Sequence, residues 1–297
     1  MAIERVGICG TDIHAFHGRH PFIRYPLVPG HELAGTVQEV PDDAQGLAAG
    51  DRVSIDPYRT CGSCRPCRIG KSNCCQSMHV LGVHGNGGLQ SLLAVEPRYL
   101  HRSRKLSTDQ LALVEPASIG AHAVQRSGLR DDETVLIVGA GPIGLAALQF
   151  ALFESGKVAV SELNPLRRQW VNDHFDVEIL EGADDRVHDV VIDATGNPKA
   201  MEQSFHRVAH GGRLVFVGII DARISFDDGL FHGRELTVLA SRNSHDDFPR
   251  IIELIECEKF DPTGWVTHRV PFQEVPPRFE QLIGDPKLIK GMIEMPA

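Results

Sequence analysis

The sequence lacks the features that are typical of nucleic-acid-binding proteins and of membrane proteins. Basic residues are outnumbered, with 30 Lys and Arg against 39 Asp and Glu, and the formal net charge of -9 repels polyanions. No apolar signal-peptide segment opens the chain, because Glu4 and Arg5 lie where one would be needed. Internal repeats and low-complexity tracts are also missing. We therefore expect a cytoplasmic protein with neither a nucleic-acid nor a membrane partner.

Long charge-free runs are almost absent as well. The exception, residues 134–153, is long enough to cross a bilayer as one helix, but glycines and a proline interrupt its first half. These residues predict a short strand, a tight turn and then a helix. The 297 residues are 42% hydrophobic and 23% charged, which excludes disordered, collagen-like and coiled-coil chains and suggests two globular domains.

The two domains differ in their sequence texture. Up to about residue 117, short β-like runs at 35–40, 51–55 and 92–95 lie among many Gly, Pro, His and Cys residues, which is typical of an irregular β-domain. From residue 134, apolar β-runs alternate with helical stretches, and this alternation predicts a parallel sheet. The predicted strands are 134–138, 158–161, 190–193 and 213–218, and the helices 142–155, 165–174 and 199–209. A helix over 247–258 and strands at 266–271 and 289–295 follow.

A glycine motif follows the first of these apolar strands and opens a helix. The motif is G-x-G-x-x-G, and its residues are Gly139, Gly141, Pro142, Ile143 and Gly144. In this context it predicts a dinucleotide-binding loop, with the pyrophosphate at the helix N-terminus. Glu162 ends the second strand, where an acid takes the ribose hydroxyls and favours NAD over NADP. Arg167 and Arg168 could neutralise a 2'-phosphate, so NADP stays the less favoured alternative.

Four cysteines lie close together in a C-x2-C-x2-C-x7-C pattern, namely Cys61, Cys64, Cys67 and Cys75. In a reducing compartment such spacing indicates a metal rather than disulfides. Four thiolates leave no open coordination position, which is typical of structural zinc. The spacing does not match that of bacterial iron–sulfur ferredoxins.

A second group of metal-binding residue types is scattered through the β-domain. Cys9 lies in an apolar run, Gly30 precedes His31 and Glu32, and Glu115 follows a later apolar run. Taken one at a time, these residues suit a packed thiol, a hydrogen-bonded imidazole and a helix-start carboxylate equally well.

Together with the glycine motif and the cysteine lobe, these segments resemble the zinc-dependent medium-chain alcohol dehydrogenases, and the polyol and threonine dehydrogenase branch most. The resemblance rests on Cys9-Gly10-Thr11-Asp12, Gly30-His31-Glu32 and Glu115-Pro116 in this order. It implies a catalytic zinc on Cys9 and His31, with Glu32 or Glu115 as the third ligand and Glu32 also in the catalytic machinery. Thr11 would then receive the substrate proton and His14 would pass it on.

The resemblance also implies an α/β architecture with two domains. Residues 1–120 and 245–297 would form a β-rich GroES-like catalytic domain with a zinc lobe at 61–75, and residues 121–244 a doubly wound Rossmann domain. Family members carry further strands before the Cys9 motif, so we expect those strands to be missing here. Two zinc ions, a nicotinamide cofactor and a homodimer or homotetramer are implied as well.

Further segments resemble a sugar-acid subgroup of the L-galactonate 5-dehydrogenase type. They are residues 81–88, 240–243 and 288–291, and they make Arg242 and His84 candidate substrate contacts. The predicted function is hydride transfer between a secondary alcohol of a polyol or sugar acid and NAD. Oxidation of an amino alcohol such as L-threonine is one alternative, and a zinc ribbon that binds nucleic acid is another.

Overall fold

The computed structural model describes residues 1–42, 44, 46–155, 157–180 and 184–296. The chain divides into two compact units, one of Met1–Ser118 with Ser244–Ala297 and the other of Ile119–Asn243. Within the described residues, no helix has the length and apolar character needed to cross a membrane. The charge-free stretch at 134–153 forms a strand and a helix separated by a turn, as predicted.

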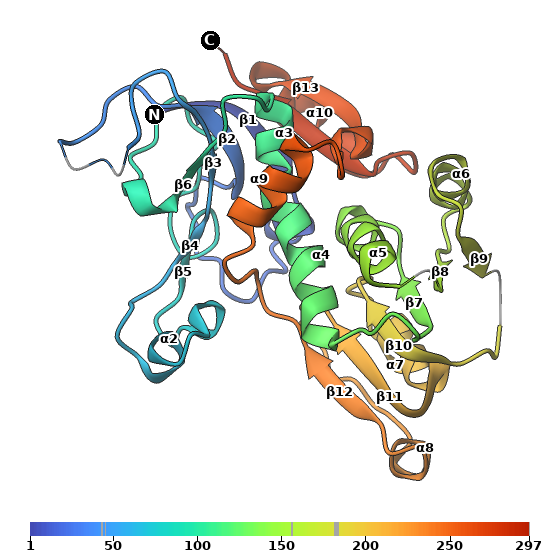
Figure 1. Ribbon diagram of the computed structural model, residues 1–297. Coiled ribbons are helices and arrows are strands. Elements are labelled where there is room, and N and C mark those ends of the chain that lie inside the picture. The colour runs from blue at the N-terminus through green and yellow to red at the C-terminus, as the bar shows by residue number, and fades with distance from the viewer. Residues whose placement is uncertain (43, 45, 156, 181–183, 297) are drawn as a thin grey trace. The chain divides into compact units, whose positions relative to one another are not determined.

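The first unit is built on a six-stranded sheet in the order β13-β14-β1-β2-β3-β6 (Figure 1). Its strands are β1 (Ala2–Ile8), β2 (Glu32–Thr36), β3 (Arg52–Ile55), β6 (Leu100–Arg102), β13 (Val266–Pro271) and β14 (Lys290–Glu294). Neighbours are antiparallel except β13 and β14, which are parallel. The central place of β1 brings the two ends of the chain together, because β1 pairs with β14 on one side and with β2 on the other.

Shorter elements complete this unit. A two-stranded sheet of β4 (Tyr58–Arg59) and β5 (His79–Val80) flanks the cysteine lobe. The helices are α1 (Gly10–Phe16), α2 (Arg65–Arg68), α3 (Thr108–Ala112), α9 (Phe248–Glu256) and α10 (Val275–Ile283). Helix α4 (Val114–Ser127) begins in the first unit and ends in the second. The core contains Ile3, Val6, Ile8, Leu33, Ile55, Leu81, Val270, Val275, Ile293 and Met295.

The second unit is a parallel sheet in the order β12-β11-β10-β7-β8-β9. Its strands are β7 (Val135–Val138), β8 (Val158–Ser161), β9 (Glu178–Leu180), β10 (His188–Asp193), β11 (Val208–Phe216) and β12 (Thr237–Ala240). Its helices are α5 (Pro142–Glu154), α6 (Pro165–His174), α7 (Pro198–Ser204) and α8 (Asp228–Gly233). The strand order reverses between β7 and β10, and ligands of such sheets bind at that point.

Several predicted elements are wrong in detail. The strands predicted over 35–40 and 213–218 are β2, which ends at Thr36, and β11, which runs from Val208 to Phe216. Residues 92–95 form no regular strand, because the segment bonds to the start of β1 only through isolated contacts such as Leu93 N to Met1 O at 3.0 Å. The helix predicted over 199–209 ends at Ser204, and Val208 already belongs to β11. Val208 is fully buried in the core of the second unit, so tertiary packing outweighs the local helical pattern there.

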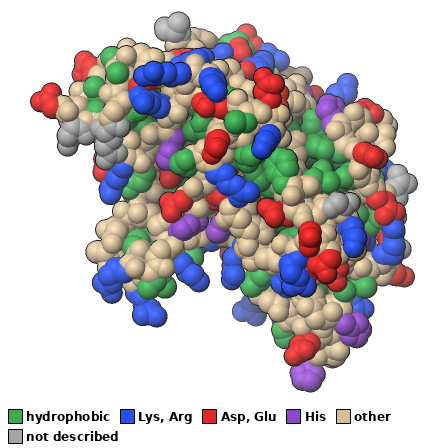
Figure 2. All heavy atoms as spheres, in the orientation of Figure 1, with side chains coloured by type: hydrophobic (Ala, Val, Ile, Leu, Met, Phe, Trp, Pro, Cys, Tyr) green, Lys and Arg blue, Asp and Glu red, His purple; other side chains and the backbone are tan. Residues whose placement is uncertain are grey.

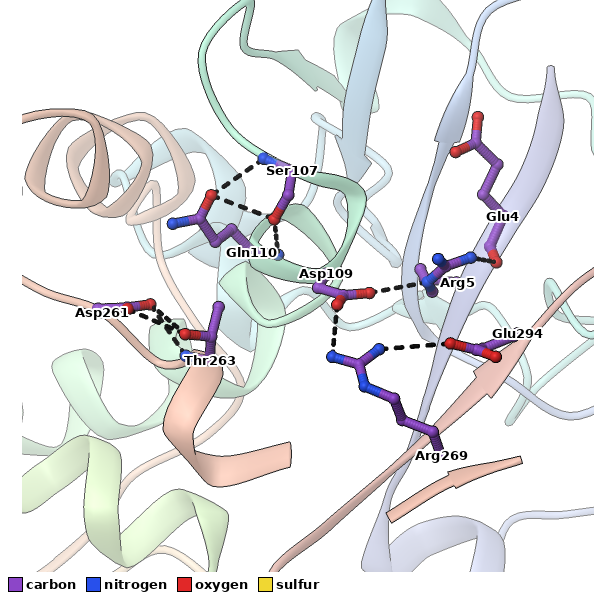
Figure 3. Close-up of polar contacts among 9 residues, drawn as sticks. All are labelled: Glu4, Arg5, Ser107, Asp109, Gln110, Asp261, Thr263, Arg269 and Glu294. Carbon is purple, nitrogen blue, oxygen red and sulfur yellow. Dashed lines mark hydrogen bonds and ion pairs between the residues drawn. The ribbon is translucent and has the colours of Figure 1, made fainter. Parts of the chain in front are cut away.

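An ion network ties helix α3 to three strands of the first unit (Figure 3). Asp109 of α3 accepts hydrogen bonds from Arg5 of β1 at 2.7 Å and from Arg269 of β13 at 2.6 Å. Arg269 also pairs with Glu294 of β14 at 3.5 Å. Burial alone would raise the pKa of Asp109, but the two guanidinium groups outweigh it and hold the pKa below its ordinary value.

Replacing Asp109 by Asn should therefore destabilise the protein in a pH-dependent way. The lowered pKa stabilises the fold above about pH 4, and this contribution disappears as the pH falls through the folded-state pKa. We expect a loss of about 1–2 kcal/mol at neutral pH, since the arginines are partly exposed. Urea unfolding at pH 7 and pH 3 measures the difference. An equal loss at both pH values would contradict this prediction.

Candidate functional site

Antiparallel pairing of β1 and β2 brings the residues of the predicted open metal site together. Gly7 lies opposite Glu32, Cys9 follows the end of β1, and His31 immediately precedes β2. One ligand atom from each of Cys9, His31 and Glu32 lies within 4.8 Å of the other two. A Cβ atom at Gly7 would lie 1.9 Å from Glu32 Oε2, so the carboxylate occupies space that only glycine leaves open.

The chemistry of this group fits a zinc ion. A thiolate, an imidazole and a carboxylate are the ligands of catalytic zinc sites, which keep a fourth position for water or substrate. His31 is 5% exposed, and its Nδ1 has no hydrogen-bond partner among the described residues. Burial alone would lower the pKa of His31, but Cys9 and the nearby carboxylates raise it well above its ordinary value. The pocket therefore attracts positive charge.

Glu115, the other candidate ligand, is not a member of that group of three, although its charge acts on His31. It begins α4, is 3% exposed, and accepts a hydrogen bond from the hydroxyl of Tyr58. Burial raises the pKa of Glu115 to about 7. No local pattern connects Tyr58 with this carboxylate. The usable signal was a tyrosine just before the cysteine lobe, because a buried tyrosine hydroxyl usually finds a hydrogen-bond partner.

Lys290 is a residue of this site that the sequence pattern did not reveal. Its ammonium donates to both oxygens of Glu32, at 2.6 and 2.7 Å, and to the carbonyl of Ile8 at 3.1 Å. Lys290 is 1% exposed, and Glu32 is fully buried. Burial would lower the pKa of Lys290, but the charges of Glu32 and Cys9 outweigh it and raise the pKa. The available signal was a lone lysine in an apolar β-run. Because buried lysines are rare unless they are paired, such a lysine indicates an acidic partner in the interior.

The predicted proton-relay residues lie on the helix that Cys9 caps. Thr11 and His14 are three positions apart in α1, so they share one face of that helix. The backbone N–H of Cys9 donates to the carboxylate of Asp12 at 2.8 Å, which fixes the first turn. Thr11 is partly buried and His14 is exposed, an order that suits transfer of a proton from a buried site to solvent.

The four cysteines of the lobe also converge. Their sulfur atoms all lie within 4.8 Å of one another, and the separations include 3.4 Å for Cys64 to Cys67 and 3.5 Å for Cys61 to Cys75. These values are far longer than a disulfide bond and close to the edge, about 3.8 Å, of a tetrahedron with zinc–sulfur bonds of about 2.3 Å. Hydrogen bonds from backbone N–H groups lower the pKa of Cys61 to about 6, which favours the thiolate.

The glycine motif has the geometry of a phosphate loop. Gly139 has a φ of +93°, and a Cβ atom at Gly144 would lie 1.8 Å from the Gly139 carbonyl oxygen. Gly141 is the N-cap of α5, and Pro142 begins the helix. Ile143 follows in the first turn. The loop therefore directs backbone N–H groups of a helix N-terminus at the point where the strand order reverses.

Glu162 lies beside this loop. Its Oε2 accepts the backbone N–H of Ala140 at 2.7 Å, and its Oε1 accepts that of Asn164 at 2.8 Å. A guanidinium nitrogen of Arg167 lies 3.9 Å from the Cβ position of Gly141, so a cation also borders the loop. Of the candidate substrate residues, Arg242 follows β12 in the second unit and His84 lies on an exposed turn of the first.

Comparison with known proteins agrees with this geometry. Residues 1–105 match the alcohol dehydrogenase GroES-like domain, and residues 142–257 match the zinc-binding dehydrogenase domain. The chain is 37% identical to L-galactonate-5-dehydrogenase of Escherichia coli K12, over 99% of this chain and 90% of the relative. It belongs to the zinc-dependent alcohol dehydrogenase family.

Solved structures of this family superpose on the dehydrogenase. The rspB alcohol dehydrogenase of Escherichia coli CFT073, solved with NADH, has a TM-score of 0.91 at 26% identity, over 99% of this chain and 90% of that one. A zinc-binding dehydrogenase of Sinorhizobium meliloti 1021, bound to NADP, has a TM-score of 0.89 at 26% identity, with the same coverage. The protein described here is thus an NAD(P)-dependent zinc oxidoreductase that acts on secondary alcohols. The predictions of the family, of the α/β fold and of the enzyme class are confirmed.

Proposed function

We propose that this dehydrogenase oxidises a secondary hydroxyl of a polyol or sugar acid with NAD. The single observation that carries the proposal is the convergence of Cys9, His31 and Glu32 within 4.8 Å in a chain that resembles L-galactonate-5-dehydrogenase. The alternative of a zinc ribbon that binds nucleic acid would leave the parallel sheet and its phosphate loop without a role. Acidic and basic side chains are also interspersed over most of the face seen in Figure 2.

In the proposed mechanism, Cys9, His31 and Glu32 would hold a zinc ion, which would supply Lewis-acid chemistry that lowers the pKa of a substrate hydroxyl. NAD would accept the hydride from the carbinol carbon. Thr11 receives the hydroxyl proton through a hydrogen bond, and His14 passes it to solvent. Glu115, held by Tyr58, is the alternative acid beside the site. Lys290 orients Glu32 and compensates its charge, because its ammonium contacts both carboxylate oxygens.

The buried charged groups of this site have partners of opposite sign. The ammonium of Lys290 contacts both carboxylate oxygens of Glu32. A buried group of charges is tolerated only when it is compensated in this way. A zinc ion held by Cys9, His31 and Glu32 would add positive charge beside the carboxylate.

The cofactor set is proposed to be two zinc ions and NAD. The second zinc would be held by Cys61, Cys64, Cys67 and Cys75 and would stabilise the lobe. The Glu162 carboxylate would exchange backbone partners for ribose hydroxyls and would repel a 2'-phosphate. The positive charge of Arg167 would attract a 2'-phosphate, so some activity with NADP is expected.

The domain assignment and cellular context are parts of the same proposal. We assign residues 1–120 and 245–297 to the catalytic domain and 121–244 to the nucleotide domain. All seven cysteines are unpaired, which suits the cytoplasm. A homodimer or homotetramer is supported by β12, which is the last strand of its sheet and leaves Val238 39% exposed.

A substrate screen tests the proposed function. The purified enzyme, loaded with zinc, is expected to reduce NAD with at least one sugar acid or polyol, measured as absorbance of the reduced cofactor. Turnover with NADP should be at least about tenfold slower, because an uncompensated charge contact is worth about 1.4 kcal/mol or more. L-Threonine is the control substrate. Turnover with L-threonine alone would contradict the proposal.

A further inference from the structure

The loop that follows strand β10 packs against the glycine motif of the second unit. It comprises residues 194–197 and begins where β10 ends beside β7. A Cβ atom at Gly139 would lie 3.0 Å from the methyl carbon of Thr195. On the other side of the loop, a Cβ atom at Gly218 would lie 2.7 Å from Gly196 Cα. The loop is therefore close-packed between the glycine motif and the segment after β11.

The buried carboxylate of Asp193 holds both the start of this loop and the helix that follows it. Asp193 is the last residue of β10 and is 0% exposed. Its Oδ1 accepts the backbone N–H of Thr195 at 2.9 Å and the Thr195 hydroxyl at 2.6 Å. Its Oδ2 accepts the hydroxyl of Ser204 at 2.8 Å. Since Ser204 is the last residue of α7, one carboxylate joins the loop to the far end of that helix.

The hydrogen bonds continue from Asp193 through the rest of the loop. The Thr195 hydroxyl oxygen accepts the backbone N–H of Asn197 at 3.1 Å, and the side chain of Asn197 caps α7. Between them, Gly196 has a φ of +56°, a conformation that favours glycine. The shape of the loop thus depends on the acceptor at Asp193, because without it the Thr195 hydroxyl loses its own acceptor.

The place of the loop in the sheet indicates which half of a dinucleotide it faces. A dinucleotide crosses such a sheet where the strand order reverses, which here is between β7 and β10. The glycine motif after β7 would hold the pyrophosphate, and Glu162 after β8 would hold the ribose of the adenosine half. The nicotinamide half would then extend in the opposite direction, toward β10 and Thr195.

We propose that Asp193 is a positioning residue for the nicotinamide half of the cofactor, because it holds the 194–197 loop and Thr195 in place at the carboxyl end of β10. The inference rests on the proposed function, in which NAD binds at the glycine motif. A loop that is already ordered costs no ordering entropy when the cofactor binds. A loop released by mutation would have to be ordered at that moment, so the affinity for NADH should fall. AMP, which lacks the nicotinamide half, should bind as before.

Binding of NADH and of AMP to the purified, zinc-loaded enzyme tests this role. Asp193→Ala removes both acceptor oxygens and should raise the Kd of NADH about tenfold while the Kd of AMP changes less than about twofold. Asp193→Asn should restore most of the affinity, because its amide can accept from Thr195 and donate to Ser204. The Ser204 hydroxyl can then donate to the carbonyl of Ala200, which lies 2.9 Å away. Isothermal titration calorimetry measures both ligands.

The matched control is Asp189→Ala, at the opposite end of the same strand. Asp189 accepts the backbone N–H and the hydroxyl of Thr134 at 2.8 and 2.7 Å, so the variant loses the same kinds of bond. It should lower the stability and keep the wild-type affinity for NADH. If Asp193→Ala does not fold, Ser204→Ala takes its place and should raise the Kd of NADH about threefold.

Three results would overturn the inference. They are an unchanged NADH affinity in the Ala variant that folds, an equal loss of NADH and AMP affinity, and a loss in Asp193→Asn as large as that in Asp193→Ala. None of these measurements needs an alcohol substrate. A wild-type enzyme that binds NADH but oxidises no polyol or sugar acid would therefore contradict the proposed substrate class alone. A wild-type enzyme that binds no NADH would contradict this inference as well.

Discussion

Replacing Cys9 by Ser is expected to remove one of two zinc ions and to lower kcat/KM about a thousandfold. Lewis-acid stabilisation by a metal is worth several kcal/mol, and about 4 kcal/mol corresponds to three orders of magnitude in rate. A serine hydroxyl is a poor zinc ligand at neutral pH, since it stays protonated where a thiol ionises. Metal analysis by mass spectrometry and steady-state kinetics with the best substrate measure both effects.

The matched control for this variant is Cys257→Ser. Cys257 is exposed, follows helix α9 and belongs to neither group of metal-binding residues. This control should keep two zinc ions and full activity. If Cys9→Ser also kept both ions and full activity, the assignment of the active site would be wrong. If it lost both ions, the two sites would not be independent, and the four-cysteine lobe would not be a closed site of its own.

Replacing Lys290 by Met should destabilise the zinc-free protein by about 3–5 kcal/mol, the usual cost of removing one partner of a buried ion pair. The loss arises because Glu32 is fully buried and its carboxylate would lose the ammonium that pairs with it. Zinc should recover part of the loss, since a cation beside Glu32 replaces the missing charge. Urea unfolding with chelator and with added zinc measures the two free energies.

Two further variants complete the design. Lys287→Met changes an exposed lysine three residues away and should have little effect. The double variant Glu32→Gln with Lys290→Met removes both charges and should be more stable than Lys290→Met alone, because no uncompensated charge is left in the interior. Equal stability of the wild type and Lys290→Met in chelator would refute the role given to this ion pair.

The nucleotide sheet was largely predictable from the sequence because its signals are local. Pro142 and Pro165 begin helices α5 and α6 where a missing backbone donor has no cost, and Gly139 supplies the positive φ of the turn. The failures arose where distant packing decides the outcome. Val208 joins a strand because its side chain fills the core, and residues 92–95 stay irregular because they bond only to the start of β1.

The candidate metal sites also differ in how far the sequence alone predicts them. The cysteine lobe lies within fifteen residues, so its spacing alone indicates a closed tetrahedral centre. The open site joins Cys9 to His31 and Glu32 through pairing of two strands, and a single sequence suggests such pairing only through the family resemblance. Lys290 lies 258 residues from Glu32, so no local pattern could connect them.

By itself, the sequence indicated the residue types of both candidate metal sites, the glycine loop and the family, since each of these depends on short contiguous segments. Only the tertiary structure shows that Glu32 lies within 4.8 Å of Cys9 and His31, that Lys290 pairs with Glu32, and that Tyr58 donates to Glu115. The physical reason is that β14, β1 and β2 are neighbours in one sheet. Their pairing brings charges from the two ends of the chain into one buried space, where each must have a partner.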